Sequence, residues 1–244
     1  MVHCERCAAQ TRFNEIFNTY KNVHFVHSNY KDADQILSCI HGQTVDKVLL
    51  DLGTSSFQLD QDTRGFSFQK DTPLKMTFSE AGSHTGFDAY DIVNSWDEEN
   101  IADILFYYGE EPKARVIAKA IVAARKVKEI KTTQDLVNVV LTVIKKKSKI
   151  NPATKTFQAL RIAVNDEYQV IKSALDNWYE KLNKGGRIAV ITFHSVEDRI
   201  VKHWMKAHER VITKKPLAPT REELLTNPRS RSAKLRVIEK IWWP

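Results

Sequence analysis

The feature that most constrains the fold is a set of short apolar segments that alternate with longer, helix-like segments. Residues 46–53 and 187–193 each contain an unbroken apolar run, and residues 22–30 and 233–243 are rich in Val, Ile and aromatic side chains. Unbroken runs of this length are typical of parallel strands that are buried on both faces. We therefore predict an α/β fold, in which a largely parallel sheet is covered by helices on both faces.

The middle of the chain has a different periodicity, because apolar residues there recur every three to four positions. This pattern is typical of amphipathic helices packed on one another. We expect residues 93–151 to form an inserted helical subdomain on the substrate side. Residues 1–92 and 152–244 would then form the sheet domain.

Local signals predict where several helices begin and end. Ser95, Thr132 and Ser195 each precede a helical pattern and are predicted N-caps. The long helical pattern over residues 153–182 is expected to break near residues 165–167, and Gly185–Gly186 are expected to end it.

The predicted strand at residues 46–50 ends in polar residues that a buried strand does not need. Asp51, Gly53, Ser55 and Ser56 follow the apolar run within six positions. Open α/β sheets bind their ligands at the carboxyl ends of parallel strands, so this series predicts a ligand site. The alternative is an ordinary polar loop.

The balance of charge favours a polyanionic partner. The chain has 37 Lys and Arg against 30 Asp and Glu, and four of its cations gather in the segment "NPRSRSAKLR". Clustered Arg and Lys side chains suit phosphate groups, although a solvated basic face gives the same pattern. The four candidate phosphate contacts are Arg229, Arg231, Lys234 and Arg236.

Several classes of protein do not fit the sequence. No apolar stretch is long enough to span a membrane, and the N-terminal residues lack the apolar core of a signal peptide, so a cytoplasmic protein is expected. Cys4 and Cys7 have the spacing of half a zinc site, but no second pair follows, so no metal is predicted. Nicotinamide, P-loop and hydrolase motifs are also lacking.

Five blocks, in this order, resemble one family of proteins: "LLDLGTSSFQLD", "RGFSF", "NPATKTFQALRIAVNDE", "GGRIAVITFHSVEDRIVK" and "NPRSRSAKLR". They are similar to the RsmH (MraW) family of S-adenosylmethionine-dependent methyltransferases. The resemblance covers roughly residues 22–241 and implies a class I, Rossmann-like methyltransferase sheet with a helical insert. The implied reaction is methylation of the N4 amino group of a cytosine in 16S, small-subunit ribosomal RNA.

The resemblance also implies roles for individual residues. Asp51 would accept a hydrogen bond from the adenine amino group of S-adenosyl-L-methionine or lie against the cofactor, and Gln58 would contact it too. Tyr30 stands where the family usually has Phe and would flank the adenine ring. Glu5 falls near the position of the ribose-binding acid of the family.

The chemistry of the implied reaction points to further candidates. The lone pair of a cytosine amino group is delocalised into the ring, so acceptors on its N–H groups help to localise it toward the methyl donor. Ser55 and Ser56 are candidate catalytic acceptors, and His194, at a neighbouring strand end, is a candidate base. A hydrogen-bonded strand-end histidine is the alternative. Phe57, Phe66 or Phe68 is a candidate to receive the flipped base, with loop packing as the alternative.

The chain also departs from the family pattern. The resemblance starts after the first strand and the glycine-rich loop that holds the methionine end of the cofactor, so we expect an N-terminally shortened sheet, weak cofactor binding and possible homodimers through the exposed strand edge. Lys75 replaces an acid in "PLKM". The alternative function is therefore a non-catalytic relative that keeps the fold and binds rRNA without cofactor.

Overall fold

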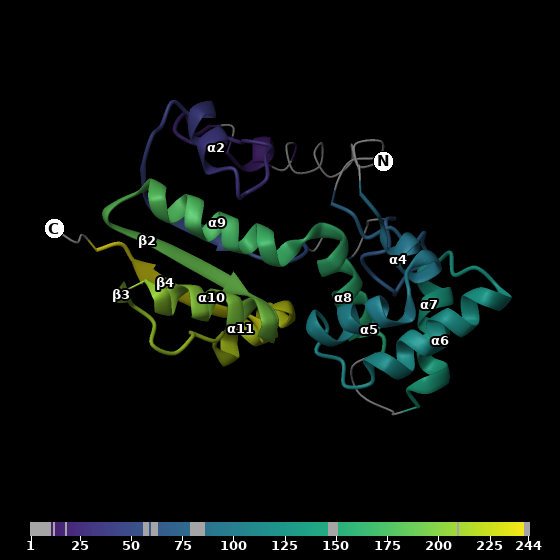
Figure 1. Ribbon diagram of the computed structural model, residues 1–244. Helices are drawn as coiled ribbons and strands as arrows, with labels where there is room; N and C mark the ends of the chain where they lie inside the picture. Colours follow the sequence, from purple (N-terminus) through teal and green to yellow (C-terminus); the bar gives the residue numbers. More distant parts are fainter. Residues whose placement is uncertain are drawn as a thin grey trace. The chain divides into compact units, whose positions relative to one another are not determined.

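The computed structural model describes residues 11, 13–17, 19–55, 59, 63–78, 86–145, 151–208 and 210–241. Its chain divides into two compact units. One contains residues 54–167, and the other contains residues 10–53 and 168–244. We call them the helical unit and the sheet unit (Figure 1). These units are defined by packing, and the assignment of residues 93–151 as a substrate-side insert stays a prediction.

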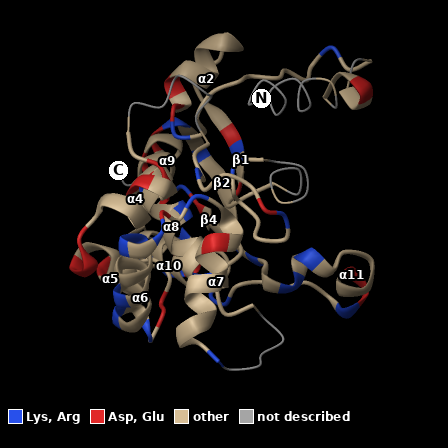
Figure 2. Cartoon of the chain, turned by 90° about the vertical axis from the view of Figure 1, so that its right-hand side faces the viewer, with Lys and Arg blue, Asp and Glu red and all other residues tan. Residues whose placement is uncertain are grey.

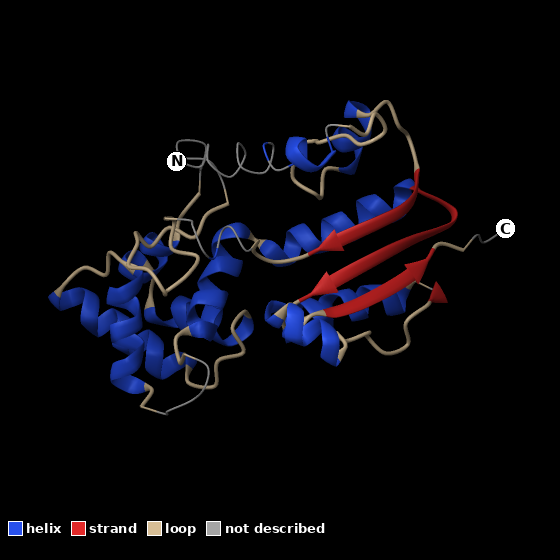
Figure 3. Ribbon diagram, turned by 180° about the vertical axis from the view of Figure 1, so that it is seen from behind, coloured by secondary structure: helices blue, strands red, loops and turns tan. Residues whose placement is uncertain are grey.

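The sheet unit has four strands in the order β1-β2-β4-β3. The strands are β1 (Val45–Asp51), β2 (Leu182–Thr192), β3 (Arg210–Val211) and β4 (Lys234–Glu239). β1 and β2 are parallel, whereas β4 runs antiparallel to β2 and β3 (Figure 3). The α/β fold class is therefore confirmed, with a mixed sheet among the described residues.

Helices α9 (Glu167–Lys181) and α10 (Ser195–Ala207) lie against the same face of this sheet (Figures 1 and 3). Burial along β2 alternates accordingly, because Ile188 and Val190 are fully buried while Ala189 and Ile191 are only half-buried. The prediction of helices on both faces is thus wrong for the described part of the unit. There β1 pairs with β2 alone, and self-association through its other edge stays a prediction.

One predicted strand is absent from the described sheet. Residues 22–30 form an irregular segment ahead of α2 (Ala33–Cys39). Val23, Phe25 and Val26 are only half-buried, so no apolar face holds this segment against a neighbouring strand. Residues 233–243, by contrast, contain β4.

The helical unit contains five helices in its described part: α4 (Ala89–Ser95), α5 (Glu98–Tyr107), α6 (Ala114–Val127), α7 (Thr133–Val143) and α8 (Thr154–Asn165). Each contributes fully buried aliphatic side chains to one core, including Ile92, Leu105, Ile117, Leu136 and Leu160. The 3.6-residue period read from the sequence therefore corresponds to a helical bundle.

The predicted caps have mixed outcomes. Thr132 caps α7 in a reciprocal capping box with Asp135, as predicted. Ser95 instead ends α4, and Asp97 is the N-cap of α5. The predicted helix break is confirmed, because Asp166 adopts a left-handed conformation with φ 46° between α8 and α9. Gly185 and Gly186 lie inside β2 rather than at a helix end.

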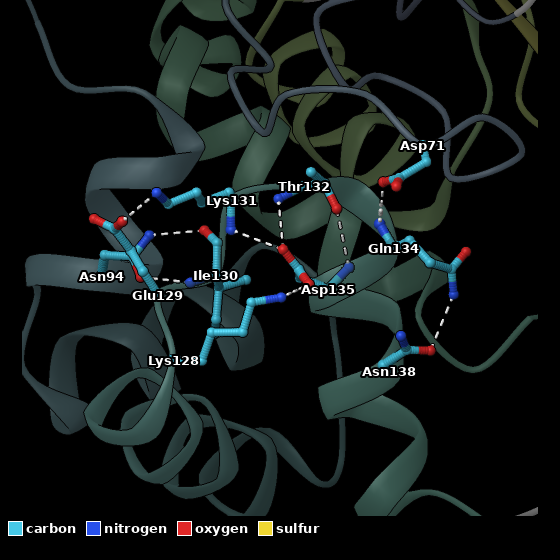
Figure 4. Close-up of polar contacts among 10 residues, drawn as sticks. All are labelled: Asp71, Asn94, Lys128, Glu129, Ile130, Lys131, Thr132, Gln134, Asp135 and Asn138. Carbon is cyan, nitrogen blue, oxygen red and sulfur yellow. Dashed lines mark hydrogen bonds and ion pairs between the residues drawn. The ribbon is translucent and has the colours of Figure 1, made fainter.

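Polar contacts fix the connection between α6 and α7 (Figure 4). Asn94 exchanges two hydrogen bonds of 2.9 and 3.0 Å with the backbone of Ile130. Asp135 accepts from the backbone amide of Lys131 and pairs with Lys128. These contacts satisfy backbone groups of the loop between the two helices, which have no partner in a helix.

The predicted base-receiving aromatics Phe66 and Phe68 pack within the helical unit. Phe66 stacks on Phe78 with ring centroids 5.0 Å apart, and Phe68 meets Phe157 edge to face at 5.2 Å. This packing supports the alternative of loop packing for both residues. Phe57 lies outside the described residues.

Candidate functional site

Asp51 lies at the carboxyl end of β1, next to the carboxyl end of β2. It pairs with Ile191 in the parallel ladder, so the two strand ends meet at one edge of the sheet. The chain turns immediately afterwards at Gly53, whose φ of +88° lies in the region that favours glycine. Desolvation by burial raises the pKa of Asp51, and the charge of Glu197 raises it further.

Glu197 is a second acid at this edge, and the sequence reasoning missed it. Its side chain is 1% exposed, and Oε2 accepts hydrogen bonds from the backbone amides of Phe193 (2.8 Å) and His194 (3.3 Å). A Cβ atom placed on Gly53 would lie 3.8 Å from Oε1 of Glu197. Glu197 therefore lies between the loop that leaves β1 and the loop that leaves β2.

A capping signal one residue from the predicted position explains why Glu197 was missed. His194, not Ser195, is the N-cap of α10, so Glu197 rather than Asp198 occupies the third helical position. The two residues form a reciprocal capping box. The block "FHSVE" contains this signal when the histidine is counted as a cap.

His194 uses one ring nitrogen in the cap of α10. Nδ1 accepts a hydrogen bond from the backbone amide of Glu197 at 3.4 Å. Nε2 lies 3.0 Å from Oε1 of Glu197. Nδ1 is therefore used in the cap of α10, whereas the buried Nε2 makes no hydrogen bond within the described residues, so the role of His194 as a base stays a prediction.

Tyr30 belongs to the same compact unit as Asp51. It precedes α2 and is 36% exposed. Its carbonyl accepts a hydrogen bond of 2.7 Å from the indole of Trp178 on α9. The backbone of the loop that carries this aromatic side chain is thus held by α9.

Four other predicted cofactor and catalytic residues remain: Glu5, Ser55, Ser56 and Gln58. Glu5, Ser56 and Gln58 lie outside the described residues. Ser55 is exposed, and its carbonyl accepts from the amide of Leu59 at 3.2 Å. Ser55 belongs to the helical unit, so its catalytic role stays a prediction.

The basic segment divides into exposed and buried cations. Arg229 and Arg231 are exposed on the short helix η1 (Pro228–Ser232), which follows α11 (Arg221–Thr226). Positions of lysine and arginine mark α11 and the chain on either side of it (Figure 2). This surface is where the sequence predicted phosphate contacts.

Arg236 is a correction to that prediction. It is 6% exposed and donates two hydrogen bonds to Asp198, of 2.7 and 3.2 Å. Lys234 lies 3.4 Å from the same carboxylate and is half-buried. Burial alone would raise the pKa of Asp198, but the hydrogen bonds and charge of Arg236, with Lys234, lower it. Arg236 therefore holds β4 to α10 and is not placed to bind phosphate.

Two negative findings concern the described residues only. No group of three or more His, Cys, Asp or Glu side chains among them is arranged to hold a metal ion, and Cys39 is a free thiol there. None of the described helices is long and apolar enough to cross a membrane. Cys4 and Cys7 lie outside the described part of the chain.

The described α/β sheet and helical unit agree with a class I methyltransferase fold, and comparison with known proteins supports that class. The family model described as the MraW methylase family matches residues 6–241. The chain therefore belongs to the MraW methylase family, as the sequence blocks indicated.

Three similar proteins are each named ribosomal RNA small subunit methyltransferase H. The protein of Coprothermobacter proteolyticus is 46% identical over 231 residues, which cover 93% of this chain and 76% of the relative. The protein of Clostridium botulinum strain Loch Maree is 43% identical over 93% of this chain and 80% of its own. The protein of Clostridioides difficile is 42% identical over 97% and 83%.

Proposed function

We propose that this chain transfers a methyl group from S-adenosyl-L-methionine to the N4 amino group of a cytosine in 16S, small-subunit ribosomal RNA. The observation that carries the proposal is the match to a methylase family over residues 6–241, with relatives named as small-subunit rRNA methyltransferases. The substrate is the rRNA or the assembled small subunit, and the place of action is the cytoplasm.

The described edge of the sheet fits the cofactor. Asp51 and Glu197 place two acids beside the turn at Gly53, and such a site favours ligands that carry N–H donors and positive charge. S-adenosylmethionine has both, an adenine amino group and a sulfonium. When bound, it supplies the electrophilic methyl group. Asp51 and Tyr30 are the proposed contacts, with Gln58 and Glu5 as further candidates.

The remaining chemistry belongs to the residues around the target amino group. Nitrogen must lose one proton as it gains the methyl group, and acceptors on its N–H bonds localise the lone pair for attack. Ser55, Ser56 and the backbone carbonyls near Gly53 are the proposed acceptors. His194 stays a candidate base, because its Nε2 makes no hydrogen bond within the described residues.

The RNA is proposed to contact the exposed cations Arg229 and Arg231, with Lys234 at the edge of this surface. Phosphate contacts position an RNA without reading its sequence, so these residues would set affinity rather than the choice of base. The alternative, a relative that binds rRNA without cofactor, is not favoured, since the similar proteins above are named methyltransferases.

The test is to incubate the full chain with unmodified small subunits and S-adenosylmethionine that carries a deuterated methyl group. The rRNA is then digested to nucleosides for mass spectrometry. We expect label in N4-methylcytidine. Label in another nucleoside would refute the proposed target atom, and no label together with retained RNA binding would support the non-catalytic alternative.

A further inference from the structure

The loop that carries Tyr30 is held by two side chains from a distant part of the sequence. Nε1 of Trp178 donates to the carbonyl of Tyr30 at 2.7 Å, and Nδ2 of Asn177 donates to the carbonyl of Lys31 at 2.8 Å. The donors lie 148 and 146 residues away along the chain. Consecutive carbonyls are therefore fixed by consecutive residues of α9.

These two hydrogen bonds restrict the backbone on the C-terminal side of Tyr30. They fix the orientation of the two peptide units that follow this residue, while its ring remains 36% exposed. Local contacts complete the turn, since the amide of Lys31 donates to Oδ1 of Asn29 at 3.1 Å. The backbone is thus fixed on both sides of the peptide bond that follows Tyr30.

The two hydrogen bonds from Trp178 and Asn177, which we call the clamp, also connect this loop to the strand end at Asp51. Trp178 is 8% exposed and packs in the core that contains Leu50 and Leu182. α9 ends at Lys181, and the next residue begins β2, which pairs with β1 up to Asp51. Residues 167–192 are therefore one continuous segment that contacts both the Tyr30 loop and the strand that ends at Asp51.

We propose that Trp178 and Asn177 are positioning residues for S-adenosylmethionine, which hold Tyr30 where it can flank the adenine ring. This inference rests on the proposed function. Neither side chain touches the cofactor itself. Loss of either hydrogen bond allows the loop to sample other conformations, so binding must select a smaller population of the free protein.

The first test compares W178F with W204F. Both substitutions remove an indole N–H donor and leave an aromatic ring. Trp204 donates to Asp176 on α9 at 2.6 Å and not to a carbonyl of the Tyr30 loop, so it is the matched control. We expect W178F to weaken the binding of S-adenosylhomocysteine about tenfold, the loss of about one hydrogen bond, with W204F close to wild type.

Kinetics and hydrogen exchange separate positioning from a general loss of structure. In W178F the KM for S-adenosylmethionine should rise about tenfold, while kcat at saturating cofactor and the KM for the small subunit stay within about twofold. Without ligand, the amides of residues 29–33 should exchange faster in W178F than in W204F. Equal behaviour of the two variants would overturn the inference.

A double-mutant cycle with Y30A distinguishes failure of the inference from failure of the proposed site. If Tyr30 flanks the cofactor, Y30A weakens binding, and adding W178F to it causes little further loss. Unchanged binding in Y30A would refute the proposed role of Tyr30. Weak binding in Y30A, with W178F and N177A both like wild type, would refute the clamp alone.

N177A keeps the inference testable if W178F does not fold. Asn177 is exposed, so its truncation removes the hydrogen bond to Lys31 without opening the core. We expect a rise of about threefold in the KM for S-adenosylmethionine, with an unchanged melting temperature. No rise in KM would count against the clamp.

Discussion

The helical unit and the sheet unit use buried residues for different purposes. Side chains that are fully buried in the helical unit are mostly aliphatic and come from helices that follow one another along the chain. The sheet unit also buries Glu197, Asp198 and Arg236, where elements far apart in sequence meet. The helical unit also buries charged side chains, namely Arg64, Glu111 and Glu167. The difference is that in the sheet unit one buried acid, Glu197, lies at the loops that leave β1 and β2, where we propose the ligand site.

The largest expected effect on stability comes from the helical core. Leu160 is fully buried, whereas Leu141 is 41% exposed and serves as the control. L160A should lower the free energy of unfolding by about 3 kcal/mol, because it removes apolar contacts and leaves a cavity. L141A should lower it by less than about 1 kcal/mol. Chemical denaturation measures both, and equal losses would contradict the assignment of this core.

The buried ion pair of the sheet unit should give an effect of similar size. R236M leaves Asp198 without its bidentate partner, which typically costs about 3 kcal/mol. Adding D198N to R236M should recover more than half of that loss, because the uncompensated charge is removed. If the double variant is no more stable than R236M, the loss reflects packing rather than charge.

The same pair predicts how stability depends on pH. The pKa of Asp198 is lower in the folded protein than in the unfolded chain, so its contribution is present above the unfolded pKa of about 3.9. It is lost as the pH falls through the lower folded value. Between pH 4 and pH 2 the free energy of unfolding should therefore fall more steeply in wild type than in D198N. Parallel curves would show that Asp198 has no shift.

The exposed cations should affect binding without affecting stability. Each phosphate neutralised on single-stranded RNA contributes about −0.7 to the slope of log K against log salt. R229A/R231A should flatten this slope by about 1.4 if both residues bind phosphate. K126A/K128A, on exposed positions of the helical unit, is the control. An unchanged slope in R229A/R231A would show that these cations form a solvated face.

The two units also differ in how well the sequence predicted them. The helical unit followed from local signals, since the 3.6-residue period and the Thr132 cap need only neighbouring residues. The end of β1 at Asp51 followed from an apolar run and its polar end. Glu197 was missed for a local reason, since the N-cap of α10 is His194 and not Ser195. Trp178 was missed because its role depends on a loop 148 residues away in the sequence. Non-local contacts of this kind leave no periodic signal in one sequence.

The segment at residues 22–30 is the reverse case, because a local pattern predicted a strand that the structure does not contain. Its Val and Phe content predicted a strand, but β-propensity describes how well a residue fits a half-buried pleated surface and not whether a partner strand is present. In the structure the neighbouring loop is held by side chains of α9 instead of by a ladder. Among the described residues no strand pairs with residues 22–30, so the local β-propensity did not produce a strand.

The most direct test of the central claim, that the end of β1 holds the cofactor, compares D51N with D46N. Asp46 lies at the opposite end of β1, and its carboxylate accepts from Asn183. Asp51 has a raised pKa in the folded state, so its charge at neutral pH opposes folding, and D51N should be at least as stable as wild type. Calorimetric titration with S-adenosylhomocysteine should show at least about 30-fold weaker binding in D51N. D46N should bind like wild type. Equal affinities in D51N, D46N and wild type would contradict the account.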